Sequence, residues 1–117
     1  MERAAVIGSG VMGTGIAAHL ANAGVSVELL DIVPDGDADR DALARGAIAR
    51  LRKAKPAPLM HADFAERIRP GNLEDHLGRV TEADWTVEVV LEDLNIKRNV
   101  FRQLEKVRKP GSIISSN

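Results

Sequence analysis

A short apolar run that ends in a glycine-rich turn constrains the fold of this chain more than any other feature. Residues 4–7 lead into Gly8, Gly10 and Gly13, spaced as G-x-G-x-x-G, and a helical pattern begins at Val11. This pattern predicts a strand, a tight turn and the start of a helix, whose free N–H groups and positive dipole end form a seat for an anion, usually a pyrophosphate. The first glycine permits the turn, the second leaves room for the ligand, and the third lets the helix pack closely on the strand.

An acidic residue follows at the distance that a dinucleotide-binding unit requires. We expect the first helix to span residues 11–23, with Gly24 as its stop, and a second strand over residues 26–30 to end at Asp31. Asp31 lies 18 residues after Gly13, where a carboxylate for the ribose hydroxyls is expected. The alternative interpretation, a glycine-rich turn without a ligand, is disfavoured once Asp31 is counted.

Composition limits the class of protein. A chain of 117 residues forms one domain with a hydrophobic core. Its net charge of −1 gives no reason to expect binding to nucleic acid or to a membrane, and no apolar run approaches the ~20 residues of a membrane span. The absence of cysteine excludes disulfides and thiol nucleophiles. We therefore expect a cytoplasmic protein that needs no metal.

The rest of the chain predicts a helical insertion and the second half of a sheet. Residues 37–69 contain two amphipathic patterns, which predict an αα-hairpin inserted after the second strand, with helices over about 37–55 and 60–69. A strand over 85–91, a helix that begins after Asp93, and a last strand over 112–115 follow. The fold class is therefore α/β, a Rossmann-type doubly wound and mostly parallel sheet.

Basic residues gather at the end of the first hairpin helix, at Arg50, Arg52, Lys53 and Lys55. They are either a solvated helix end, which suits the helix dipole, or a site for a phosphorylated part of a substrate. Both interpretations remain open at this point.

Three segments, together with Asp31, carry a specific resemblance. V-I-G-S-G-V-M-G-T-G-I-A at 6–17, then Asp31, then V-E-V-V-L-E-D-L-N-I-K at 87–97 and K-P-G-S-I-I-S-S-N at 109–117 resemble the NAD-binding domain of 3-hydroxyacyl-CoA dehydrogenases. The resemblance covers essentially the whole chain. It is closest to the versions in bacterial fatty-acid oxidation proteins, including bifunctional ones that also hydrate enoyl-CoA.

The resemblance implies a role for each matching position. The glycine turn would hold the pyrophosphate of NAD, and Asp31 would bind the adenosine ribose and repel the 2′-phosphate of NADP. Glu92 and Lys97 would lie near the nicotinamide, where they could form an ion pair. The basic helix end would fit the phosphates of coenzyme A. The implied cofactor-binding residues are Gly8, Ser9, Gly10, Val11, Met12, Gly13, Asp31, Glu92 and Lys97.

The chain also departs from the family. A threonine and serine that follow S-N, a catalytic histidine paired with a glutamate, and a C-terminal helical domain are not found in it, and His19, His61 and His76 lack the context of the catalytic histidine. We therefore expect an NAD-binding fragment, truncated before the end of its domain and inactive alone.

The parent protein would oxidise (3S)-3-hydroxyacyl-CoA to 3-oxoacyl-CoA in fatty-acid β-oxidation, as a homo-oligomer or part of a multienzyme protein. The alternatives are another NAD-dependent Rossmann dehydrogenase and a non-catalytic NAD-sensing module.

Overall fold

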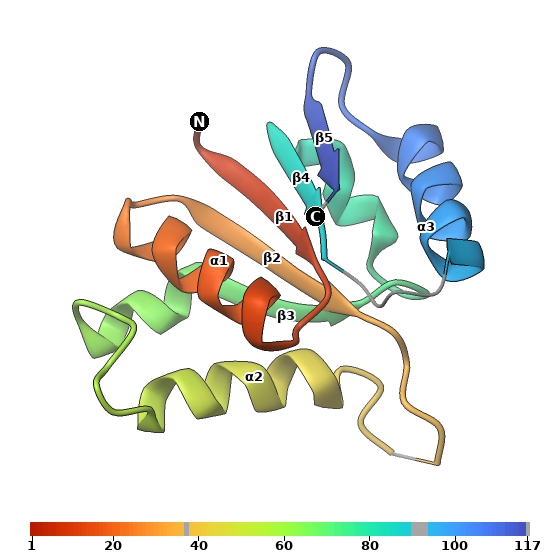
Figure 1. Cartoon of the computed structure of the whole chain (residues 1–117). Coiled ribbons are helices and arrows are strands. Elements are labelled where there is room, and N and C mark those ends of the chain that lie inside the picture. Colours follow the sequence, from red (N-terminus) through yellow and green to blue (C-terminus); the bar gives the residue numbers. More distant parts are fainter. Residues whose placement is uncertain (37, 90–93, 117) are drawn as a thin grey trace.

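The structure, a computed structural model, describes residues 1–36, 38–89 and 94–116. In this part of the chain, parallel strands form one sheet in the order β3-β2-β1-β4-β5 (Figure 1). The strands are β1 (Arg3–Ile7), β2 (Ser26–Asp31), β3 (Ile68–Asn72), β4 (Trp85–Glu88) and β5 (Ile113–Ser116). The α-helices are α1 (Val11–Asn22), α2 (Ala42–Lys53) and α3 (Leu94–Val107), and the 3₁₀-helices are η1 (Ala62–Arg67) and η2 (Leu77–Glu82). The predicted Rossmann-type doubly wound sheet is confirmed.

Helices cover both faces of the sheet. The side chains of β1 alternate between two cores: Ala4 and Val6 pack with α1, α2 and η1, whereas Ala5 and Ile7 pack with η2 and α3. All four side chains are fully buried. A strand covered on both faces must be apolar throughout, which explains why the run before the glycine turn has no polar residue.

The inserted segment differs from the predicted hairpin in its details. Asp37 lies outside the described residues, and α2 begins only at Ala42. The carboxylate of Asp39 accepts the N–H of Asp41 at 3.0 Å, and such a local side-chain turn competes with helix formation. The acidic residues therefore precede the helix instead of forming its first turn.

The regular α-helix predicted for residues 60–69 is wrong. Residues 62–67 form the 3₁₀-helix η1, and Ile68 already belongs to β3. His61, Phe64 and Arg67 stack three residues apart: the rings of His61 and Phe64 lie 5.6 Å apart, and the guanidinium of Arg67 lies 3.9 Å from the centre of the Phe64 ring. Side chains at positions i and i+3 eclipse in a 3₁₀-helix, so this stack favours the tighter helix.

The second half of the sheet follows the prediction with shorter elements. β4 ends at Glu88, three residues before the predicted end of the strand at residue 91. Asp93, the predicted N-cap of the next helix, lies outside the described residues. α3 and β5 lie where the sequence predicts them.

Candidate functional site

The carboxyl ends of the strands meet at one edge of the sheet. The connection after β1 passes through α1 on one face, and α3, which follows β4, covers the opposite face. Ligands of doubly wound sheets bind at such a reversal, in the crevice beyond the carboxyl ends of the strands. Gly8 follows β1, Asp31 ends β2, Glu88 ends β4 and Ser116 ends β5. The crevice between β1 and β4 is the candidate site.

The first and third glycines shape the turn from β1 into α1. Gly8 has a φ of 112°, in the left-handed region that favours glycine, and its N–H donates to the carbonyl of Leu30 at 2.7 Å. A Cβ on Gly13 would lie 1.9 Å from the carbonyl oxygen of Gly8 and 2.8 Å from Val89 Cγ2. Gly13 therefore permits the close contact between α1 and the carboxyl end of β1.

Gly10 has a different environment. A Cβ placed on it would meet nothing within 4 Å, and its backbone is extended, with a φ of −69°. As the N-cap of α1 it provides no side-chain hydrogen bond. Beside it, Val11 is 96% exposed and Met12 is 57% exposed. The helix therefore starts at an open apolar surface, where its first N–H groups can meet an anion.

Asp31 contacts the glycine turn directly. Its Oδ2 accepts the N–H of Ser9 at 2.7 Å and the hydroxyl of Ser9 at 2.5 Å, while its Oδ1 accepts the N–H of Ile32 at 2.7 Å. The hydroxyl of Thr14 donates to the carbonyl of Ser9 at 2.9 Å and secures the other side of the turn. The structure thus brings Asp31, the residue predicted to bind the ribose, into contact with the glycine turn that is predicted to bind the pyrophosphate.

Lys97 lies on the other side of the crevice. Its Nζ is 3.9 Å from Oε2 of Glu88, which also accepts the hydroxyl of Ser116 at 2.8 Å. Glu92 lies outside the described residues, so its pairing with Lys97 stays a prediction. Among the described residues, the ion pair of Lys97 is with Glu88.

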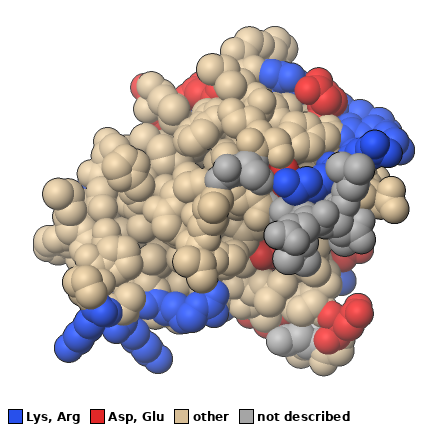
Figure 2. Space-filling model, in the orientation of Figure 1, with Lys and Arg blue, Asp and Glu red and all other residues tan. Residues whose placement is uncertain are grey.

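The basic end of α2 approaches the glycine turn. A hollow of about 250 Å³ separates the two helices and is lined by Gly10, Val11, Thr14, Arg50, Leu51 and Ala54. Figure 2 shows a basic cluster at the lower left, over the carboxyl end of α2, whose last turn contains Arg50, Arg52 and Lys53. Arg50 is the member of this cluster that lines the hollow.

The histidines lie apart from the crevice. His19 is in the last turn of α1, away from the helix start, and His61 packs on Phe64 beside η1. The Nδ1 of His76 accepts the N–H of Asn72 at 2.9 Å, at the end of β3. Within residues 1–36, 38–89 and 94–116, no group of histidines and carboxylates could hold a metal, and no helix there is long and apolar enough to cross a bilayer.

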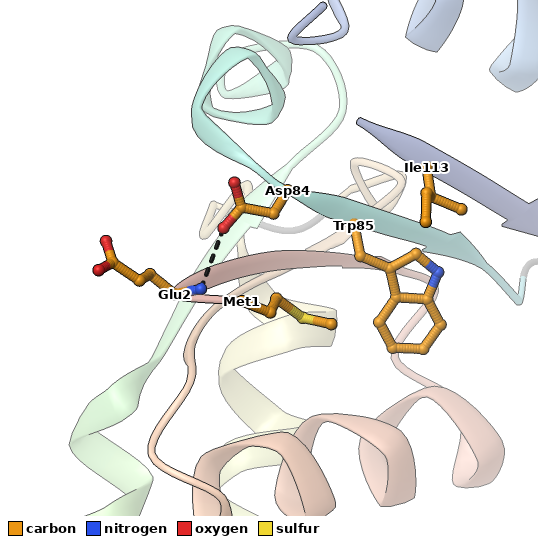
Figure 3. Close-up of a pocket in the computed structure, with 5 residues that line it drawn as sticks. All are labelled: Met1, Glu2, Asp84, Trp85 and Ile113. Atoms are coloured by element: carbon orange, nitrogen blue, oxygen red, sulfur yellow. Dashed lines mark hydrogen bonds between the residues drawn. The ribbon is translucent and has the colours of Figure 1, made fainter. Parts of the chain in front are cut away.

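A second hollow, of about 660 Å³, lies at the other end of the strands, where β1, β4 and β5 begin (Figure 3). It is lined by Met1, Glu2, Asp84, Trp85 and Ile113. Asp84 accepts the N–H groups of Glu2 and Arg3 at 3.0 and 3.2 Å, and the ammonium of Lys109 at 2.6 Å. This carboxylate anchors the start of β1 to the loop before β5.

The anchor at Asp84 predicts a pH-dependent stability. The hydrogen bond from Lys109, followed by those from the N–H groups of Glu2 and Arg3, holds the pKa of Asp84 far below its usual value of 3.8. Because the pKa is lower in the folded state, the stabilisation is present above about pH 4 and is lost as the pH falls toward the folded pKa. Urea unfolding should show Asp84→Asn less stable than the wild type at pH 7, with a difference that shrinks below pH 4.

The control for this prediction is Glu82→Gln, because Glu82 forms an exposed ion pair with Arg3 at 3.7 Å and such pairs contribute little. A stability difference for Asp84→Asn that stays constant from pH 7 to pH 2.5 would contradict the role of its charge.

Sequence reasoning missed one contact and one residue of the crevice. Ser9 was predicted to bind the cofactor, but the bond from its hydroxyl to Asp31 was not predicted. Glu88 is fully buried, although only the later glutamate of the same segment was assigned a role. The signal for Glu88 was present, because a lone acid inside an apolar parallel strand needs a buried partner.

Comparison with known proteins agrees with this geometry. The family model described as "3-hydroxyacyl-CoA dehydrogenase, NAD binding domain" matches residues 3–117. A probable 3-hydroxyacyl-CoA dehydrogenase of Bacillus subtilis is 49% identical over all of this chain and 17% of its own length. Its counterpart in Deinococcus radiodurans is also 49% identical, over all of this chain and 34% of its own length. Other relatives are named as fatty acid oxidation complex enzymes.

Solved structures share the fold. The crystal structure of M. tuberculosis FadB2 superposes with a TM-score of 0.79 at 28% identity, over all of this chain and 41% of FadB2. The chain thus spans 41% or less of the length of each of these proteins.

Proposed function

Because the chain belongs to the family of NAD-binding domains of 3-hydroxyacyl-CoA dehydrogenases, we propose that it supplies the cofactor-binding half of an enzyme that oxidises (3S)-3-hydroxyacyl-CoA to 3-oxoacyl-CoA in fatty-acid oxidation. NAD is the cofactor of this family. The observation that carries the proposal is the start of α1 at a glycine N-cap without a side chain, which lies beside the carboxylate of Asp31 at the reversal of the strand order.

The residues of the crevice fit a dinucleotide. The space around Gly10 admits a pyrophosphate close to the backbone, and Gly10, as the N-cap residue, gives the helix start no side-chain hydrogen bond. Asp31 uses one oxygen for Ser9 and the other for Ile32. A carboxylate oxygen has two acceptor sites, so Oδ1 retains capacity for a ribose hydroxyl.

Each proposed residue has a distinct task. Residues 8–13 hold the pyrophosphate through backbone N–H groups, with Gly8, Gly10 and Gly13 providing the turn, the access and the packing. Asp31 accepts the adenosine ribose hydroxyls and repels a 2′-phosphate. Glu92 and Lys97 act on the nicotinamide side.

When bound, NAD supplies the hydride acceptor of the reaction. The residues of this chain bind and orient the cofactor at the sheet edge. The general base is proposed to be a histidine supplied from outside residues 1–117, as part of a longer and multifunctional protein or an oligomer. The basic end of α2 is proposed to meet the phosphates of coenzyme A, since guanidinium and ammonium groups bind phosphate strongly.

Titration of NAD into the chain by calorimetry tests the proposal. The wild type should bind NAD, and Asp31→Ala should bind it on the order of 10- to 100-fold more weakly, because the hydrogen bonds of the ribose hydroxyls to a charged acceptor are lost. The same variant should lose the preference for NAD over NADP, because the repelling charge is absent.

The matched control is Asp35→Ala, which removes the same charge from an exposed turn four residues later. It should bind NAD as the wild type does. A wild-type chain that binds no NAD at millimolar concentration would refute the proposed function.

A further inference from the structure

A carboxylate is buried at the end of β4, beneath the crevice. Glu88, the last residue of β4, has no exposed surface. It lies between Ile7 of β1 and Ser116 of β5 in the register of the sheet. A buried carboxylate is costly unless it is paired and hydrogen-bonded, so the contacts of Glu88 identify what it holds.

Two groups from other elements converge on one oxygen of this carboxylate. Oε2 of Glu88 accepts the hydroxyl of Ser116 at 2.8 Å and lies 3.9 Å from Nζ of Lys97. Ser116 is exposed, and the side chain of Lys97 keeps a quarter of its surface exposed. Glu88 therefore connects β4 to α3 and β5 through two polar groups that reach the surface of the crevice.

The topology gives the direction of the cofactor across this surface. The adenosine ribose lies at Asp31 on β2 and the pyrophosphate at the turn after β1, if the proposed function holds. The two halves of a dinucleotide bind on either side of the reversal of strand order. The second nucleotide half then extends over the carboxyl ends of β4 and β5, where Lys97 and Ser116 reach the surface.

Resting on the proposed function, we propose that Glu88 is a positioning residue for the nicotinamide–ribose half of NAD. Its carboxylate takes the single hydroxyl proton of Ser116, so the Ser116 oxygen faces the ligand as an acceptor, while the ammonium of Lys97 is a donor. Together they offer one acceptor and one donor. A ribose hydroxyl and a carboxamide each contain both complementary groups.

The test compares NAD with ADP, which keeps the adenosine ribose and the pyrophosphate but lacks the second nucleotide half. Both ligands are titrated by calorimetry into the wild type, Glu88→Gln and Ser116→Ala. We expect each variant to bind NAD about tenfold more weakly, as for the loss of one charge-assisted hydrogen bond. ADP affinity should stay within about twofold of the wild type.

Thr86→Val is the matched control. Thr86 lies on the same strand and face as Glu88 and is also buried, and its hydroxyl is one of two buried side-chain groups without a hydrogen-bond partner in the described part of the chain. This variant changes a buried polar group below the crevice without touching Lys97 or Ser116. It should bind both NAD and ADP as the wild type does.

The outcomes separate the two proposals. A wild type that binds neither ligand overturns the proposed function, and this inference with it. If the wild type binds both ligands, two results for Glu88→Gln overturn only the positioning role. One is an equal loss of NAD and ADP affinity, and the other is an unchanged affinity for NAD. If Glu88→Gln does not fold, Ser116→Ala decides the question, because Ser116 is exposed and its replacement should not prevent folding. Unchanged NAD affinity in Ser116→Ala then overturns the inference.

Discussion

Replacing Gly13 by alanine is expected to lower the free energy of unfolding by about 3 kcal/mol, at the upper end of overpacking effects. The new Cβ would lie 1.9 Å from the backbone oxygen of Gly8. Neither backbone can yield without moving α1 away from the sheet, because Gly8 is itself held by Leu30. Chemical unfolding should show the loss directly, and the melting temperature should fall by about 10 °C.

The matched control for this change is Gly15→Ala, two residues later in the same helix. A Cβ on Gly15 meets nothing within 4 Å, and alanine favours a helix over glycine by up to about 1 kcal/mol. Gly15→Ala should therefore be as stable as the wild type or more so. Equal stability of Gly13→Ala and the wild type would contradict the packing role of Gly13.

Replacing Gly10 by alanine should separate binding from folding. The backbone of Gly10 suits any residue, and a Cβ there would enter open space, so the unfolding free energy should fall by no more than about 1 kcal/mol, the cost of alanine at an N-cap. The same methyl group occupies the space that the pyrophosphate needs. Calorimetry should show NAD affinity reduced by about 100-fold, which corresponds to about 2.7 kcal/mol.

Gly15→Ala again provides the comparison, because it adds the same methyl group to the same helix outside the proposed seat. It should keep wild-type affinity for NAD. If Gly10→Ala binds NAD as tightly as Gly15→Ala does, the anion does not lie at the start of α1. Two glycines of one motif thus differ in their expected effects: replacing Gly13 should lower stability, and replacing Gly10 should weaken NAD binding.

Local patterns were sufficient for much of this fold. The apolar residues before Gly8 can only be a strand covered on both faces, and the glycine spacing requires a tight turn into a helix. The spacing of Asp31 predicted its place at the end of β2, and the structure brings it to the glycine turn. These features depend on short-range geometry, which the order of residues specifies directly.

The inserted segment shows where local patterns mislead. Met60, Phe64 and Ile68 have the spacing of an α-helix, but Met60 is 82% exposed and Ile68 joins β3. Pairing of β3 with β2 takes Ile68 to the position opposite Val27. The stabilisation that Ile68 gains by pairing with a residue 41 positions earlier in the chain cannot be inferred from the spacing of apolar residues in its own segment.

The amino-acid order alone determined the strand–turn–helix unit, the acid at the end of β2 and the parallel sheet, because each follows from backbone sterics and the period of apolar residues. Tertiary structure alone decided which side chains meet: the hydroxyl of Ser9 with Asp31, and Lys97 and Ser116 with Glu88. These contacts join strands and helices that lie far apart in the chain. Their partners are chosen by the order and register of the strands, which only the folded sheet establishes.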